Sequence, residues 1–153
     1  MASGQRIFEV TDVDVEVKDR DDAEDPEEID GSIEFRDVTF GYEAGNTILK
    51  NISFNVSPGE TVALVGPTGS GKTSTTSLVH RFYDTWEGDV LVGGQNVRDV
   101  TQASLGRHIA MVLQEPFLFS ASIEENIRYA KTDATFDDVV AAAKAVGAHE
   151  FIT

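Results

Sequence analysis

The feature that most constrains this chain is the stretch from residue 60 to residue 77, ETVALVGPTGSGKTSTTS. Its apolar residues 62–65 indicate a short buried strand, which is followed by a glycine-rich turn and a helix that begins near Gly71. The turn fits the spacing Gly-x-x-x-x-Gly-Lys-[Ser/Thr] of a phosphate-binding loop. The residues that fill this spacing are Gly66, Pro67, Thr68, Gly69, Ser70, Gly71, Lys72 and Thr73.

The residue types in this loop suit an anionic ligand. Glycines let the backbone wrap closely, so that successive N–H groups point at an anion, and the helix N-terminus adds unpaired N–H groups and a positive dipole end. Lys72 is expected to bridge terminal phosphates, and Thr73 to offer its hydroxyl to a magnesium ion. An ordinary strand-to-helix loop is the alternative, but the complete motif in its required context favours a nucleoside-triphosphate site.

Composition removes several other classes of function. The chain has no cysteine, which excludes disulfides, thiolate metal sites and cysteine nucleophiles, and its three histidines show no metal-ligand spacing. The net charge of −15 argues against a nucleic-acid partner. The sequence contains no apolar run long enough to span a membrane and no signal-peptide layout at its N-terminus. At 153 residues it has the length of one domain.

The acidity is concentrated at the start of the chain. Residues 1–30 hold 12 acidic and 3 basic side chains, and from residue 12 onward they contain little apolar surface. We therefore predict that residues 1–30 are an acidic linker, solvated from residue 12 onward. Ile7, Phe8 and Val10 give residues 2–10 some apolar character, and these residues are expected to close a helix. Calcium binding is the sharper alternative, but the ligand spacing with its glycine turn is absent.

The remaining residues alternate between strand and helix patterns. Besides residues 62–65, strands are expected at residues 33–40 (with a break in phase near Arg36 and Asp37), 52–56, 88–92 and 109–113. The helix after the loop is expected to reach about residue 83, and a short helix to extend from a cap at Thr101 to residue 107. Ser122 with Glu125, and Thr135 with Asp138, have the spacing of helix-capping boxes.

A second motif of nucleoside-triphosphatases, an apolar strand that ends in a magnesium-binding Asp, is not evident. The candidate run IAMVLQE places Gln114 at the metal-binding position, and an amide oxygen is a weaker magnesium ligand than a carboxylate. The residues alone leave two possibilities. Either this motif is degenerate, or it is a different motif and the Asp lies elsewhere.

Residues 31–153 contain, in chain order, the segments IEFRDVTFGY, ILKNISFNVSPGETVALVGPTGSGKT, RFYDTWEGDVLVGG and LGRHIAMVLQEPFLFSASIEENIRYA. With these segments in this order, residues 31–153 resemble the ATP-binding cassette of an exporter-type ABC transporter. The segment LQEPFLFSASIEENI is highly specific. The resemblance implies an α/β fold of the P-loop NTPase class, with a RecA-like core and an antiparallel β subdomain, truncated before the signature motif and the Walker B strand. Residues 1–30 then follow a transmembrane domain, and residues 31–153 are the N-terminal part of the cassette.

The resemblance also implies roles for individual residues. Tyr42 matches the aromatic residue that stacks on adenine, and residues 66–73 hold the phosphates of ATP, with Thr73 on Mg²⁺. Gln114 matches the Q-loop glutamine, which contacts Mg²⁺ and the attacking water and is therefore the one catalytic candidate. Phe117, Leu118 and Phe119 lie where the cassette meets intracellular helices of the transporter, although an ordinary core cluster is an equal alternative.

The implied partners are a second cassette, identical or different, and a transmembrane domain contacted through the Q-loop region. The implied location is the cytoplasmic face of a membrane, the inner membrane in a bacterium or archaeon. The family's signature motif, Walker B Asp, catalytic Glu and switch His are expected downstream of Thr153, so we predict weak ATP binding and no hydrolysis by this chain alone. A soluble ABC ATPase subunit and a non-catalytic nucleotide-binding module remain alternatives.

Overall fold

The structure is a computed structural model that describes residues 15–153, and these form two compact units. Unit 1 comprises the described residues up to Ala110, and unit 2 comprises residues 111–153. Each unit is described by itself. The helix expected over residues 2–10 lies outside the described residues.

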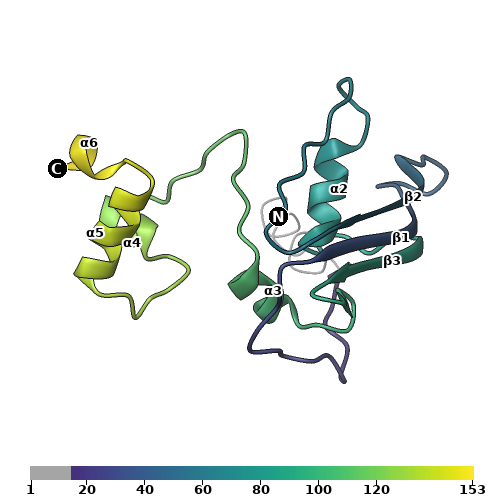
Figure 1. The fold of residues 1–153 in the computed structure, drawn as a ribbon, viewed down its shortest axis with the longest axis horizontal. Coiled ribbons are helices and arrows are strands. Elements are labelled where there is room, and N and C mark those ends of the chain that lie inside the picture. Colours follow the sequence, from purple (N-terminus) through teal and green to yellow (C-terminus); the bar gives the residue numbers. More distant parts are fainter. Residues whose placement is uncertain (1–14) are drawn as a thin grey trace, which may run out of the picture. The chain divides into compact units, whose positions relative to one another are not determined.

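Unit 1 contains an antiparallel sheet of four strands. They are β1 (Ile33–Phe40), β2 (Leu49–Val56), β3 (Glu87–Val92) and β4 (Gln95–Asn96), hydrogen-bonded in the order β2-β1-β3-β4. Figure 1 labels the three longer strands, β1, β2 and β3. The predicted strands at residues 33–40, 52–56 and 88–92 are confirmed. They form because alternating aromatic and β-branched residues supply one apolar face to the sheet.

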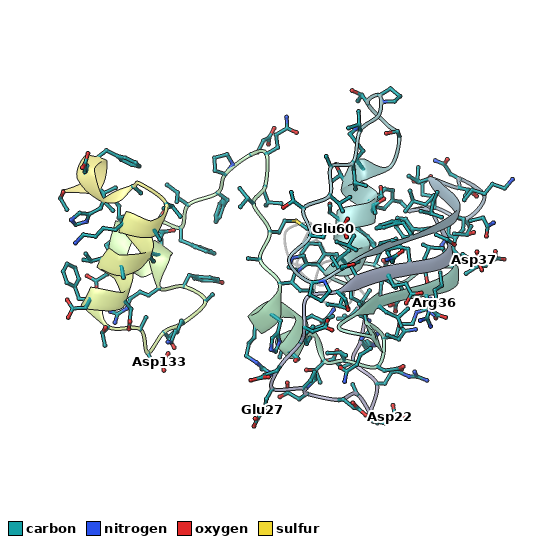
Figure 2. All side chains as sticks on the ribbon, in the orientation of Figure 1. Asp22, Glu27, Arg36, Asp37, Glu60 and Asp133 are labelled. Atoms are coloured by element: carbon teal, nitrogen blue, oxygen red, sulfur yellow. The ribbon has the colours of Figure 1, made fainter. Side chains whose placement is uncertain are left out.

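The predicted break in β1 is a bulge at Asp37. This residue has a φ of 49°, and the pairing with β2 shifts register between Phe35 and Val38. The Ser53 hydroxyl on β2 donates to the Asp37 carboxylate at 2.9 Å and accepts from the Asp37 N–H at 2.8 Å. The side chains of Arg36 and Asp37 point outward at this edge of unit 1 (Figure 2). The bulge lets Phe35, Val38 and Phe40 all reach the core despite the break in alternation.

Two short helices complete unit 1. Helix α2 (Lys72–Val79) buries Leu78 in the core with Phe35, Phe40 and Val90, and α3 (Gln102–His108) adds Leu105. The predicted cap at Thr101 is confirmed, since its side chain accepts a hydrogen bond from the N–H of Ser104. Helix α2 is shorter than the expected extension to residue 83, because Arg81 adopts a left-handed φ of 53° that ends the helix.

Two predicted strands are wrong. Residues 62–65 and 109–113 have no strand structure, and Val65 and Val112 are 93% and 98% exposed. Apolar runs of this kind are typical of parallel strands that are covered on both faces, and a strand exists only where a neighbour satisfies its backbone. No described segment pairs with either run. The one sheet of residues 15–153 is antiparallel, and neither residues 62–65 nor residues 109–113 form a strand of it.

The acidic segment at the start of unit 1 is docked rather than free. We call residues 16–27 the strap. Glu24 pairs with Val100 in a parallel bridge, in which the Glu24 backbone N–H donates to the Asp99 carbonyl at 2.7 Å and the Glu24 carbonyl accepts from the Thr101 N–H at 2.9 Å. The expectation of a solvated linker therefore holds for exposed side chains such as Asp22 and Glu27, which point outward (Figure 2), but not for the backbone. Backbone pairing needs no apolar side chains, which explains how so acidic a segment can dock.

Unit 2 consists of three short helices. They are α4 (Ile123–Ile127), α5 (Phe136–Ala145) and α6 (His149–Ile152), of which α5 packs against the other two. Both predicted capping boxes are confirmed, with Ser122 and Glu125 bonded reciprocally at the start of α4, and Thr135 and Asp138 at the start of α5. Unit 2 is thus organised chiefly by local signals.

Candidate functional site

The glycine-rich loop leads into α2 through two residues in the left-handed conformation. Gly69 has a φ of 83° and Gly71, which caps α2, has a φ of 85°. A Cβ at Gly71 would lie 2.5 Å from a methyl group of Leu49, so both the backbone conformation and the packing require glycine there. The turn is closed by the N–H of Ser70, which donates to the carbonyl of Pro67 at 3.2 Å. The predicted strand before the loop is absent, yet the loop and the helix start are in place.

The Lys72 ammonium lies against the loop itself. It donates to the carbonyl oxygens of Gly66 at 2.9 Å and Pro67 at 2.8 Å, and it lies 3.4 Å from the Ser70 hydroxyl. These are neutral oxygens on an exposed loop, and phosphate oxygens are stronger partners for an ammonium group. The phosphate oxygens of a bound polyphosphate can therefore replace the Gly66 and Pro67 carbonyls as partners of the Lys72 ammonium group.

Tyr42 is fixed beside the same helix. Its hydroxyl lies 2.9 Å from that of Ser74 in the first turn of α2, and its ring packs edge-on against Phe40 and Tyr83 with centroids 5.1 Å and 5.0 Å away. The ring is still 51% exposed. A flat, half-exposed aromatic face close to a phosphate-binding loop is suited to stacking on a base.

Gly41 explains how Tyr42 reaches this place. A Cβ at Gly41 would overlap the carbonyl oxygen of Asn46 and lie 2.6 Å from the Trp86 ring. Only glycine permits this close turn at the end of β1, and the turn directs the next residue toward α2.

The expected metal ligands form a sparse set. Thr73 is exposed in the first turn of α2, as a magnesium ligand must be, and residues 15–153 contain no cluster of three or more His, Asp or Glu that could hold a metal ion. Magnesium often keeps several waters and takes one or two protein ligands together with phosphate oxygens. A single hydroxyl next to a phosphate cradle fits that mode of binding.

Gln114 and the aromatic cluster after it belong to unit 2. Gln114 is exposed, and its catalytic and metal-binding role stays a prediction. Phe117 and Leu118 are 73% and 75% exposed, which does not favour the alternative of an ordinary core. Phe119 stacks on Tyr129 at 4.3 Å, so the cluster is partly ordered at the surface of unit 2.

Sequence reasoning missed three residues of this region. Ser74 and Tyr83 contact Tyr42, and Arg81 lies 2% exposed directly after α2. A Ser after the loop motif and an Arg-Phe-Tyr run are visible in the sequence, but the partner of Ser74 lies 32 positions away.

Burial lowers the pKa of His80, at the end of α2, so its imidazole favours the neutral form.

Comparison with known proteins gives consistent matches. Residues 49–152 match the family described as ABC transporter. The chain is 45% identical over 152 residues to an uncharacterised ABC transporter ATP-binding protein of Bacillus subtilis, covering 99% of this chain and 25% of that protein. It is 45% identical over 148 residues to a beta-(1→2)glucan export ATP-binding/permease protein of Nitrobacter winogradskyi, covering 97% of this chain and 24% of that protein.

A structural match adds the fold. A bacterial Atm1-family ABC exporter with ATP bound superimposes with a TM-score of 0.89 at 38% identity, covering 98% of this chain and 26% of that chain. The predicted α/β class, a P-loop NTPase fold with an antiparallel β subdomain, is confirmed, as is the resemblance to exporter cassettes. The chain spans about a quarter of the length of these relatives. None of its helices within residues 15–153 is both long and apolar enough to cross a membrane.

Proposed function

The chain belongs to the ABC transporter family, and on that premise we propose that unit 1 binds Mg-ATP, with residues 66–73 on the phosphates and Tyr42 on the adenine ring. The observation that carries the proposal is the hydrogen bond between Tyr42 and Ser74. It fixes an exposed aromatic face to the helix that begins at Lys72, so a base site and a phosphate site share one element.

The residues would divide the work of binding as follows. Lys72 would leave the carbonyls of Gly66 and Pro67 for the terminal phosphates, while loop N–H groups and the start of α2 bind the phosphate oxygens. Thr73, with Gln114 from unit 2, would ligate Mg²⁺, which when bound neutralises charge on the β- and γ-phosphates. Gln114 would also orient the attacking water.

For the longer protein, we propose that the cassette pairs with a second cassette, hydrolyses ATP and powers export of a substrate across a membrane. The names of the relatives support this, because one is a beta-(1→2)glucan export protein and another is an ATP-dependent lipid A-core flippase of Desulfotalea psychrophila, 43% identical over 152 residues. The strap would follow the transmembrane domain, and the exposed residues 117–119 would meet it near the Q-loop. The cassette would then lie at the cytoplasmic face of the membrane.

A second candidate is nucleotide binding without turnover by this chain. Residues 15–153 contain no cluster of three or more His, Asp or Glu that could hold a metal ion, and Glu115 is an exposed residue of unit 2. We therefore expect weak Mg-ATP binding and no hydrolysis above background. Robust turnover by the purified chain would overturn this account.

Titration of the chain with Mg-ATP tests the proposal. Lys72→Ala should weaken binding roughly 10- to 100-fold, because a hydrogen bond to a charged group contributes about 1.5–3 kcal/mol. Lys50→Ala removes an exposed lysine from β2 and is the matched control. Tyr42→Ala should weaken Mg-ATP about tenfold, since stacking on a base contributes about 1–3 kcal/mol, but leave Mg-triphosphate unaffected. Equal affinity of wild type and Lys72→Ala for Mg-ATP would refute the phosphate site.

A further inference from the structure

Arg81 is a buried cation outside the nucleotide-binding residues, and the strap supplies part of its environment. Its guanidinium is 2% exposed and donates to the carbonyl of Lys18 at 3.0 Å and to the Asp84 carboxylate at 3.1 Å. It also lies 3.6 Å from the Asp19 carboxylate and 3.4 Å from the Val100 carbonyl. A charge that is taken out of water is tolerated only when it is paired and hydrogen-bonded, so Arg81 depends on the strap.

The other side of the strap is anchored to the start of α3. The Asp19 carboxylate accepts from the N–H of Gln102 at 3.0 Å, so one side chain contacts both Arg81 and α3. Further along, the Ser104 hydroxyl donates to the Pro26 carbonyl at 3.2 Å, and His108 Nε2 lies 3.0 Å from the Glu27 carbonyl. Together with the bridge at Glu24, these bonds run the length of the strap.

Arg81 in turn belongs to the end of the phosphate-loop helix. The Arg81 N–H donates to the Leu78 carbonyl at 3.1 Å, and the Phe82 N–H donates to the Ser77 carbonyl at 3.0 Å. These bonds close the last turn of α2, whose first residue is Lys72. The left-handed conformation of Arg81 costs energy in a residue with a side chain, and its buried contacts are what hold it.

The strap also reaches the base side of the proposed site. Glu16 and Val17 line a cavity of about 180 Å³ together with Tyr42, Tyr83 and Trp86. The strap thus touches the end of α2 through Arg81 and forms one wall of the hollow beside Tyr42.

We propose that the strap is a coupling element of the nucleotide-binding domain, and that Arg81 is the positioning residue through which strap docking and α2 stabilise each other. Release of the strap would leave Arg81 short of partners, loosen the end of α2 and open the hollow beside Tyr42, which weakens Mg-ATP binding. Because linkage is reciprocal, Mg-ATP would tighten the strap by the same factor. The predicted effect on Mg-ATP binding rests on the proposed function, whereas the predicted coupling between the strap and α2 does not.

Asp19→Asn tests the coupling, with Asp21→Asn as the matched control. Both changes remove one negative charge from the strap, but Asp21 is exposed and its side chain has no hydrogen bond or ion pair with the residues the structure describes. The first readout is amide hydrogen exchange of the whole 153-residue chain without nucleotide. In Asp19→Asn, exchange should speed up about 5- to 20-fold at Gln102 and Glu24 in the strap contact. It should speed up equally at Arg81 and Phe82, whose N–H groups close the last turn of α2. Asp21→Asn should match wild type at all four amides.

The second readout is affinity for Mg-ATP. Asp19→Asn should bind Mg-ATP more weakly than wild type, and Mg-ATP should slow exchange at Glu24 in wild type but not in Lys72→Ala. Arg81→Lys, which keeps the charge but loses the planar fork, should behave like Asp19→Asn.

Three results would overturn the proposal. In Asp19→Asn, exchange could speed up at Glu24 and Gln102 but not at Arg81 and Phe82, or it could stay unchanged at Glu24 and Gln102. Alternatively, Asp21→Asn could show the same faster exchange as Asp19→Asn. If wild type fails to bind Mg-ATP, the proposed function falls, while the nucleotide-free exchange still decides whether strap and α2 are coupled.

Discussion

Unit 1 and unit 2 hold their apolar residues in opposite ways. Unit 1 closes a core from residues far apart in sequence, with Phe35, Phe40, Leu78 and Leu105 at most 2% exposed. In unit 2 the buried apolar side chains are Ala134, Val139 and Ala143, while its aromatic residues lie at the surface, and its helices line a cavity of about 320 Å³. Short helices without a core are marginal in water, so unit 2 depends on its caps. One chain thus contains a unit stabilised by packing and a unit stabilised by local hydrogen bonds.

The largest expected effect separates the two units by their cores. Phe35→Ala should lower the free energy of unfolding of unit 1 by about 3–5 kcal/mol, because the ring is 1% exposed, stacks on Phe54 and pairs with Val90. The single tryptophan, Trp86, lies in unit 1 and reports its unfolding in urea. Phe151→Ala in unit 2, at a ring 79% exposed, should change stability by only about 0.5 kcal/mol. Similar losses of unfolding free energy from Phe35→Ala and Phe151→Ala would contradict the difference in burial of the two rings.

A smaller effect tests how tightly the sheet of unit 1 is packed. Gly88 and Gly59 both have a φ of 76°, but a Cβ at Gly88 would overlap the carbonyl oxygens of Arg36 and Asp37, whereas one at Gly59 meets nothing within 4 Å. Gly59→Ala should cost about 1 kcal/mol of backbone strain. Gly88→Ala should cost about 1–3 kcal/mol more, since the bulge of β1 must shift. Urea unfolding followed at Trp86 measures both, and equal costs would show that the bulge yields freely.

The same contrast explains what the sequence could predict. The caps at Thr101, Ser122 and Thr135 were predictable because each signal and its response lie within four residues. The strands at residues 62–65 and 109–113 were not, since an apolar run becomes a strand only beside a partner, and the partner is not encoded in the run. The docking of the strap could not be predicted from the sequence for a related reason, because Asp19 and the Gln102 N–H that it accepts from lie 83 positions apart.

The candidate site divides in the same way. The loop at residues 66–73 is a contiguous motif, so its turn and helix start follow from spacing alone, and Lys72 and Thr73 stand where the motif puts them. The contact of Tyr42 with Ser74 required the whole fold of unit 1. The roles of Tyr42 and Gln114 came from family resemblance, not from local chemistry, and they stay predictions.

A third change probes the caps of unit 2. The Thr135 side chain accepts from the N–H of Asp138 at 3.2 Å, and its own N–H donates to the Asp138 carboxylate at 2.9 Å. Thr135→Ala should destabilise α5 by about 1 kcal/mol, visible as faster amide exchange from Val139 to Ala143. Thr132→Ala, at an exposed threonine outside the helices, is the control. Equal exchange rates from Val139 to Ala143 in Thr135→Ala and Thr132→Ala would contradict a stabilising role for this cap.

The smallest effect is a pH dependence of the same caps. The N–H of Thr135, and next its hydroxyl, hold the pKa of Asp138 below its ordinary value, and the hydroxyl and then the N–H of Ser122 do the same for Glu125. A carboxylate whose pKa is depressed by folding contributes stability that is present above its unfolded pKa, about 4, and is lost as pH falls through the folded pKa. Amide exchange in α4 and α5, corrected for its intrinsic pH dependence, should therefore show weaker protection as pH falls below about 4.

Asp138→Asn should abolish the part of this response that arises in α5, and Asp137→Asn, which changes the neighbouring carboxylate outside the capping box, should leave it in place. Asp30 and Glu34 in unit 1 also have lowered pKa values, through the N–H of Ser32 and the guanidinium of Arg36. Neither caps a helix, and both lie outside the hydrophobic core of unit 1, so acid should loosen unit 2 before the core of unit 1. The opposite order, with Trp86 reporting unfolding of unit 1 while α5 stays protected, would show that packing rather than capping holds unit 2 together.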